Sequence, residues 1–201
     1  MRCLLPLPFA VLLAGCADGV QPANEVDRAH SKPPVYPKQE QHDGVMGMFV
    51  GFCNVAPSGA STCHLAWGSN PAFAEAGRAF LAQVRFTAGT GDPHRRMQVR
   101  FITPAQRRLA VVTAPDEVVM RGKAGSALET VRYNCLVGLD AFVHDCAAPV
   151  TDTPDAIAPA RIALAHLPLG PDFDGETAIA RRRDITVKIV PPGMDADNPF
   201  N

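Results

Sequence analysis

The sequence lacks an excess of charge of either sign. Its 19 Lys and Arg residues nearly balance its 20 Asp and Glu residues, which gives a formal net charge of −1 at pH 7. Domains that bind nucleic acid carry a basic patch or stripe, so this balance argues against nucleic acid as a partner. Apolar residues make up 47% of the chain, which excludes wholesale disorder and allows a packed core.

The sequence also lacks an apolar run long enough to cross a bilayer, which takes about 20 residues. The best candidate, residues 4–13, follows Arg2 and is only long enough for a secretory signal. The run ends in Leu-Ala-Gly-Cys16, which resembles a bacterial lipobox. The resemblance implies cleavage before Cys16 and lipid on its sulfur and amino group, an anchor of several acyl chains that binds a membrane stably.

The predicted lipid anchor implies a location in the cell. We expect residues 1–15 to be a lipoprotein signal peptide and the mature chain to lie on the periplasmic side of a bacterial cell envelope. By resemblance to lipoprotein sorting signals, Ala17, where an aspartate would retain the protein, favours the outer membrane over the inner. The alternatives are an ordinary secretory signal in which the cysteine occurs by chance, and a buried apolar strand.

The motifs of common enzyme classes are missing. The chain has no H-E-x-x-H, no S-x-x-K and no glycine-rich phosphate loop, and Ser58 is not in a G-x-S-x-G turn. The acidic stretch Asp172-x-Asp174-x-Glu176 lacks the remaining ligands of a calcium loop. The sequence therefore predicts that the protein is not an enzyme and holds no cofactor or metal.

Four cysteines remain after Cys16 and the signal peptide are set aside. Nine residues separate Cys53 from Cys63, and ten separate Cys135 from Cys146. A zinc site built from thiolates takes close pairs, typically two to four residues apart. The spacing and the oxidising compartment therefore favour disulfides, for which three pairings exist.

An internal repeat indicates that the two halves of the chain share one fold. Each half contains two cysteines, an alanine-rich segment that begins near a proline, a basic cluster, and a strand-like segment (97–102 and 185–190) followed closely by proline. The basic clusters contain Arg95, Arg96, Arg181, Arg182 and Arg183. These arginines are weak candidates for binding anionic lipid headgroups or the carboxylates of peptidoglycan, and the alternative is that they are solvated residues before a strand.

The first half can be assigned in detail. Residues 45–55 and 60–67 are strand-like, and Pro57-Ser58-Gly59 between them predicts a hairpin loop with Gly59 at positive φ. This loop places Cys53 opposite Cys63, which predicts a disulfide whose loop closure contributes roughly 3 kcal/mol. Repetition then predicts the pair Cys135–Cys146.

The hairpin register also assigns the two faces of the first sheet. It places Phe49, Val55, Leu65 and Trp67 on one face, and the apolar residues Met48, Val50, Phe52 and Ala66 on the other. A sheet with one wet face would be polar there, so something must cover the second set. The second half of the chain is the nearest candidate, and the rivals are a second copy or a bound partner.

A helix and a third strand complete the unit. Asn70 and Pro71 begin a helix whose apolar residues recur to Val84, and alternation over 97–101 predicts a strand. The fold class predicted is α+β, with two tandem β-β-α-β units, each a small antiparallel three-stranded sheet with one helix. In the second unit Pro159 either cuts the helix or begins a shorter one, and the connector can add strands at 109–113 and 117–120.

The expected boundaries follow from composition. They are a signal peptide at 1–15, a flexible tether at 16–33, the first unit at 34–104, a connector at 105–130, the second unit at 131–190 and a loose tail at 191–201.

The first unit resembles a known family. Its Pro34-Val-Tyr-Pro37, Gly44-Val-Met-Gly47 and Val55-Ala-Pro-Ser-Gly59 segments, followed by the helix and closing strand, are similar to the C-terminal domain of TonB-like energy transducers. The hairpin with two cysteines resembles the cysteine-bearing variant of that domain. The resemblance covers residues 34–103 in good order and 131–190 faintly.

The resemblance implies a periplasmic module whose sheet edge pairs with a short segment of an outer-membrane receptor by strand addition. TonB itself has a membrane helix where this chain has a lipobox. We therefore expect a lipid-anchored binding or adaptor module that is not itself an energy transducer, with an envelope protein or peptide as partner. The alternative is a structural envelope lipoprotein that contacts peptidoglycan.

Overall fold

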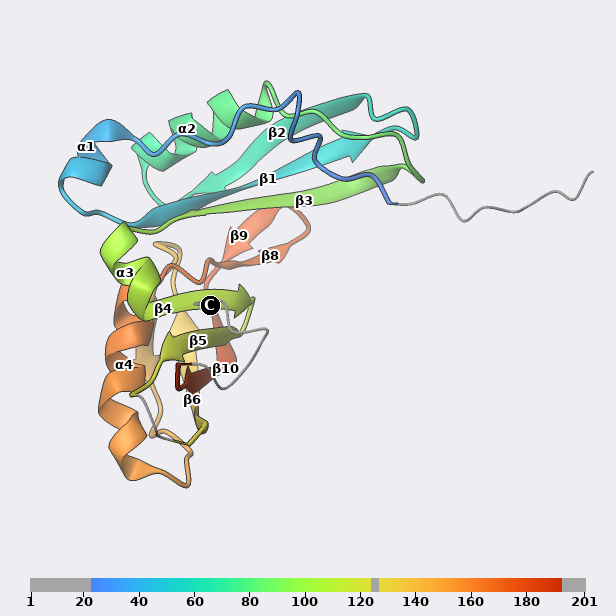
Figure 1. The fold of residues 1–201 in the computed structure, drawn as a ribbon. Helices are drawn as coiled ribbons and strands as arrows, with labels where there is room; N and C mark the ends of the chain where they lie inside the picture. The colour runs from blue at the N-terminus through green and yellow to red at the C-terminus, as the bar shows by residue number, and fades with distance from the viewer. Residues whose placement is uncertain (1–22, 124–126, 193–201) are drawn as a thin grey trace, which may run out of the picture.

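A computed structural model describes residues 23–123 and 127–192 (Figure 1). The first unit is a three-stranded antiparallel sheet of order β2-β1-β3 with α2 on one face. Its elements are α1 (Lys38–His42), β1 (Gly47–Val55), β2 (Ser61–Gly68), α2 (Pro71–Leu81) and β3 (Asp92–Phe101). The predicted β-β-α-β order of this unit is confirmed.

The second unit repeats this plan and extends it. Its sheet has the order β4-β5-β10-β6-β7, so the three strands β7-β6-β10 match β2-β1-β3 of the first unit. Strands β4 and β5 come from the connector, and β5 pairs with β10 in parallel. The elements are α3 (Pro104–Leu109), β4 (Ala110–Ala114), β5 (Glu117–Arg121), β6 (Glu129–Val137), β7 (Val143–Cys146), a 3₁₀ turn η1 (Pro154–Ala156), α4 (Ile157–His166), β8 (Asp172–Asp174), β9 (Thr177–Ile179) and β10 (Arg181–Val190).

The α+β class with two disulfide-stapled hairpins is confirmed. Cys53 pairs with Cys63 and Cys135 with Cys146, each between directly opposed residues of adjacent strands. In the first hairpin Gly59 has φ of +85°, and a Cβ there would lie 2.3 Å from the Phe86 carbonyl oxygen. The loop therefore needs glycine at this position for both its conformation and its close approach.

A β-bulge changes one face assignment. The predicted register holds from Gly51 to Val55, but it shifts by one residue between Val50 and Gly51. Trp67 consequently pairs with Val50 and packs with Met48 and Val50 on the face away from α2. The expectation that Trp67 lies on the α2 face was wrong, because a bulge inserts one residue and reverses the alternation beyond it.

Local signals explain both longer helices. Asn70 caps α2 by accepting a hydrogen bond from the Phe73 backbone N–H at 2.9 Å, and Pro71 is at the first helical position. Pro159 lies in the first turn of α4, where its missing N–H has no intrahelical partner to lose. The proline therefore lies within a shorter helix of ten residues and does not break it.

The segment before α1 packs against the first unit where a tether was expected. Asn24 is buried, donates to the carbonyl oxygen of Thr87 at 2.7 Å and accepts from the Gly91 N–H at 2.7 Å. Val26 forms a β-bridge with Phe86. From Asn24 onward, the expected tether (16–33) is therefore packed against the first unit and is not a flexible linker.

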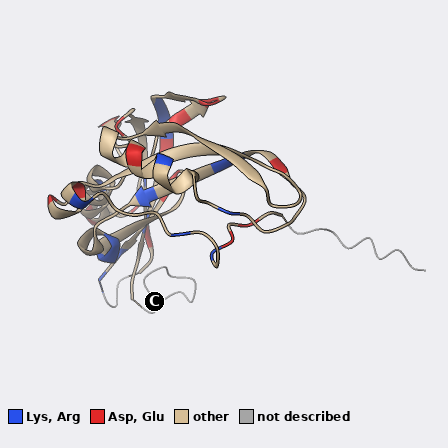
Figure 2. Ribbon diagram, turned by 90° about the horizontal axis from the view of Figure 1, so that it is seen from above, with Lys and Arg blue, Asp and Glu red and all other residues tan. Residues whose placement is uncertain are grey.

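The two units are stacked with the first sheet above the second (Figure 1). Helix α2 covers the upper face of the first sheet, and the β8–β9 hairpin lies beneath its lower face. Basic and acidic residues are interspersed over both units (Figure 2), as the nearly neutral composition suggests.

Candidate functional site

The outer edge of β3 is the longest open sheet edge in the structure. The strand has ten residues and ends the first sheet, with β1 on its inner side. Within residues 23–123 and 127–192, no backbone hydrogen bond joins this outer edge to another element. The other edge strands are shorter, with eight residues in β2, five in β4, four in β7 and three each in β8 and β9.

The same edge of the second unit is occupied. Strand β10 corresponds to β3 in the repeat, and β5 pairs with its outer side from Thr186 to Val190. The connector thus adds a strand at the position that is empty in the first unit. The comparison of the two units shows that this architecture accepts a strand at this edge.

Side chains of β3 alternate between two environments. Met97, Val99 and Phe101 pack into the core beneath α2. On the opposite face His94 stacks on Phe52, with ring centroids 4.6 Å apart, and the Arg96 guanidinium lies 4.7 Å from the centroid of a ring in the second unit, that of Phe173.

The lower face of the first sheet is covered by the second unit. Met48 and Val50 are fully buried in a cluster with Ala141, and Trp67 and Phe173 pack against this cluster. We call this contact the junction. The expectation that the apolar second face is covered from within the chain is confirmed, since Ala141 and Phe173 belong to the second unit.

Two arginines bind the loop before β8 to this junction. Arg100 donates through Nε to the Pro168 carbonyl oxygen at 3.0 Å and through Nη2 to that of Leu169 at 3.3 Å. Arg183 donates through Nη2 to the Gly170 carbonyl oxygen at 3.0 Å. Residues 168–170 are thereby bonded to β3 of one unit and β10 of the other.

Asp116 and Asp172 partly offset the positive charge at the junction. Arg183 Nη1 lies 3.3 Å from Asp172 Oδ1, and its buried Nε lies 3.3 Å from Asp116 Oδ1 without pointing a hydrogen at it. Burial lowers the pKa of Arg96, an effect that Asp172 opposes and Arg183 reinforces. Burial, then repulsion from Arg183 and Arg96, lowers the pKa of Arg100 to about 10.

The five arginines predicted as weak binding residues are not brought together. Arg96 and Arg183 lie at the junction, whereas Arg95 lies 3.8 Å from Asp92 on the same strand. Arg181 lies 3.8 Å from Asp172. Arg96, Arg181 and Arg183 therefore lie near Asp172, whereas Arg95 and Arg182 lie apart from them.

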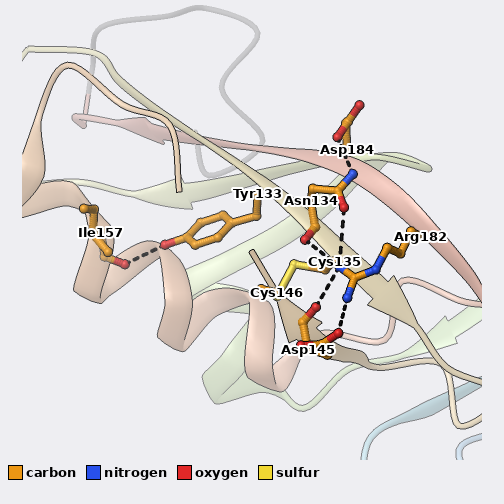
Figure 3. The surroundings of a disulfide bond; sticks show 8 residues. All are labelled: Tyr133, Asn134, Cys135, Asp145, Cys146, Ile157, Arg182 and Asp184. Carbon is orange, nitrogen blue, oxygen red and sulfur yellow. Dashed lines mark hydrogen bonds and ion pairs between the residues drawn. A yellow bond between two sulfur atoms is a disulfide. The ribbon is translucent and has the colours of Figure 1, made fainter. Parts of the chain in front are cut away.

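Arg182 lies beside the second disulfide. It binds the Asp145 side chain and donates to the Asp145 carbonyl oxygen at 3.0 Å (Figure 3). On the neighbouring strand Asn134 donates to Asp184 at 2.7 Å. Arg182 thus ties β10 to the end of β7, where Cys146 lies.

Arg100 is the functional candidate that the sequence interpretation missed. It follows the basic cluster of the first unit by four residues and lies on the face that the second unit covers. The available signal was a charged residue in register with Met48, on the face where β1 presents the apolar residues Met48, Val50 and Phe52. Such a residue indicates a buried polar contact.

The remaining predictions concern features that the structure describes partly or not at all. Cys16 lies outside the described residues, as does most of the expected tail at 191–201. None of the helices in the described residues has the length and apolar character of a membrane span. Those residues also contain no group of three or more His, Cys, Asp or Glu placed to hold a metal ion.

Comparison with known proteins adds no relative. No protein-family model matches the chain, and neither the curated proteins nor the solved structures contain a match. Functional inference therefore depends on the site itself.

Proposed function

We propose that this protein is a lipid-anchored binding or adaptor module on the periplasmic side of the bacterial envelope, at the outer membrane. It recognises an extended segment of an envelope protein by strand addition at β3. The observation that carries the proposal is the occupied edge of the second unit, where β5 pairs with β10, beside the open and longer edge of β3. The resemblance of residues 34–103 to TonB C-terminal domains supports the same edge chemistry.

The physical basis is the row of backbone N–H and C=O groups that an edge strand presents. An incoming segment gains main-chain hydrogen bonds there, and its alternate side chains meet the surfaces on either side of the sheet. In this protein one of those surfaces carries Arg95 and Met97, and the other carries His94 and Arg96. The lipid on Cys16 restricts the module to partners at the membrane surface.

The alternative of a structural lipoprotein that binds peptidoglycan has less support from the geometry. That interpretation relied on the arginines of the basic clusters, of which Arg182 binds Asp145 and Arg183 is nearly buried at the junction. We therefore keep strand addition as the proposal.

The test uses proline to remove single N–H groups from β3. Neighbouring strand residues point their N–H groups to opposite edges, so one of Gln98→Pro and Val99→Pro removes an outward N–H while the other removes a bond to β1. The variant that keeps the fold must lose binding to peptides from the N-terminal segments of outer-membrane receptors. Backbone amide shifts on peptide addition should follow β3.

A matched pair of proline variants on the other edge is the control. His64→Pro and Leu65→Pro change β2 in the same way, and the folded member of that pair should bind peptide as the parent does. Binding that survives in the folded β3 variant, or that is lost equally from β2 and β3, would reject the proposal.

A further inference from the structure

A cleft lies where the end of β3, helix α3 and strand β4 meet. It has a volume of about 290 Å³ and is lined by Arg100, Ile102, Arg107, Val111 and Val112. Two guanidinium groups thus share a cleft with three branched apolar side chains. This volume is at the small end of the range for ligand pockets, so the cleft suits a small organic molecule or a single peptide residue.

Arg100 enters the cleft with hydrogen-bond donors to spare. Its Nε and Nη2 are used on the carbonyl oxygens of Pro168 and Leu169, but its Nη1 has no acceptor among the described residues and is not fully buried. A guanidinium has five N–H donors in a planar fork. At least the two donors of Nη1 remain for a ligand.

Arg100 also lacks a counter-charge. Among the described residues no carboxylate lies within 4.0 Å of its guanidinium, whereas Arg183 has both Asp116 and Asp172. Arg96 and Arg183 are close enough to lower its pKa, which remains about 10, so Arg100 is cationic at neutral pH. A half-buried cation among other cations gains from an added anion.

Arg107 supplies a second cation from a different element. It lies on α3, is exposed, and has no hydrogen-bond or ion-pair partner within residues 23–123 and 127–192. Its neighbour Arg108 is also exposed but does not line the cleft. The two side chains therefore make a matched pair, one at the cleft and one beside it.

We infer that this cleft binds a carboxylate carried on a small branched apolar group. A carboxylate matches the planar donor fork of a guanidinium better than a point charge does, and each such bond is charge-assisted. Ile102, Val111 and Val112 would bury the apolar part of the ligand, which a hydrated inorganic anion does not need. The inference is independent of strand addition at β3.

The probe is isobutyrate, with isobutyramide as its neutral counterpart of the same shape and inorganic phosphate as a second anion. The full chain is titrated with each at constant ionic strength, and the backbone amide signals of Ile102, Val111 and Val112 are followed by NMR. We expect saturable shifts with isobutyrate, none with isobutyramide, and weaker binding of phosphate.

Arginine variants complete the test. Arg107→Ala should weaken isobutyrate binding by at least about tenfold, because one charge-assisted contact is lost. Arg108→Ala should change it by less than about twofold, since only long-range charge is removed. Equal losses in the two variants, binding of isobutyramide as strong as that of isobutyrate, or tighter binding of phosphate would each overturn the inference.

Discussion

The junction between the two units can be tested with a pair of glycine substitutions. Gly170 and Gly175 both have positive φ, +87° and +58°, so alanine at either position costs about 1–2 kcal/mol of backbone strain. They differ in their surroundings. A Cβ on Gly170 would lie 2.7 Å from Met48 Cε and 2.8 Å from Met48 Sδ, whereas a Cβ on Gly175 meets nothing within 4 Å.

The contact with Met48 sets the expected difference. Met48 is fully buried at the junction, and forcing extra atoms into a packed core costs about 1–3 kcal/mol. The methionine side chain is flexible and can change its conformation, so we expect a cost near the low end of this range. Gly170→Ala should therefore destabilise the protein by about 1 kcal/mol more than Gly175→Ala.

Urea-induced unfolding measures this difference. Trp67 is the only tryptophan and packs at the junction, so its fluorescence reports on the contact directly. In a Met48→Ala background, the penalty of Gly170→Ala should fall to that of Gly175→Ala, because the crowded atoms are gone. Equal penalties for the two glycines in the parent, or no coupling to Met48, would refute the junction as described.

Two further predictions concern pH and the anchor. Hydrogen bonds from Lys188 and Thr113 lower the pKa of Glu117 below its ordinary 4.5, so the stability it contributes is present above that value and is lost as the pH falls through the lower folded pKa. Glu117→Gln should therefore lose less stability than the parent on acidification from about pH 5 to pH 3; equal losses in acid urea titrations would contradict this. Cys16→Ser should move the protein from the membrane to the soluble periplasmic fraction or leave it unprocessed, and a membrane-bound variant of ordinary mature mass would refute lipidation.

Features that depend on neighbouring residues were predictable from the sequence. The loop Pro57-Ser58-Gly59 set the pairing of Cys53 with Cys63, and Asn70 with Pro71 marked the start of α2. Each of these signals acts through the backbone conformation of a few adjacent residues. The repeat then carried the pairing to the second hairpin, where Cys135 faces Cys146.

Features that depend on distant contacts were not predictable in the same way. The bulge between Val50 and Gly51 is one case, because Gly51 alone does not fix where the register shifts, and the residues that crowd Gly51, Leu81 and His64, lie on other elements. The parallel pairing of β5 with β10 joins strands more than 60 residues apart in the chain. Such a pairing needs the whole sheet to form before it is favourable.

The basic clusters show the same limit at the candidate site. Arg181, Arg182 and Arg183 are adjacent, yet only Arg181 and Arg183 lie near Asp172 at the junction, whereas Arg182 binds Asp145. Alternation along β10 separates neighbours onto opposite faces, and only the stacking of the two units decides which face is buried. The hydrogen bonds of Arg100 also depend on that stacking, since its acceptors Pro168 and Leu169 are more than 60 residues away in the chain.

The charges on β3 also bear on why its edge stays open. A long open edge risks pairing between copies of the same chain, and proline and inward or flanking charges are the usual protection. Strand β3 contains Pro93 near its start, followed by Arg95 and Arg96, whereas β5 covers the outer edge of β10. Two β3 edges in antiparallel contact would bring like charges together, which is unfavourable. Under the proposed strand addition at β3, the same arginines would favour a partner segment that carries acidic residues opposite them.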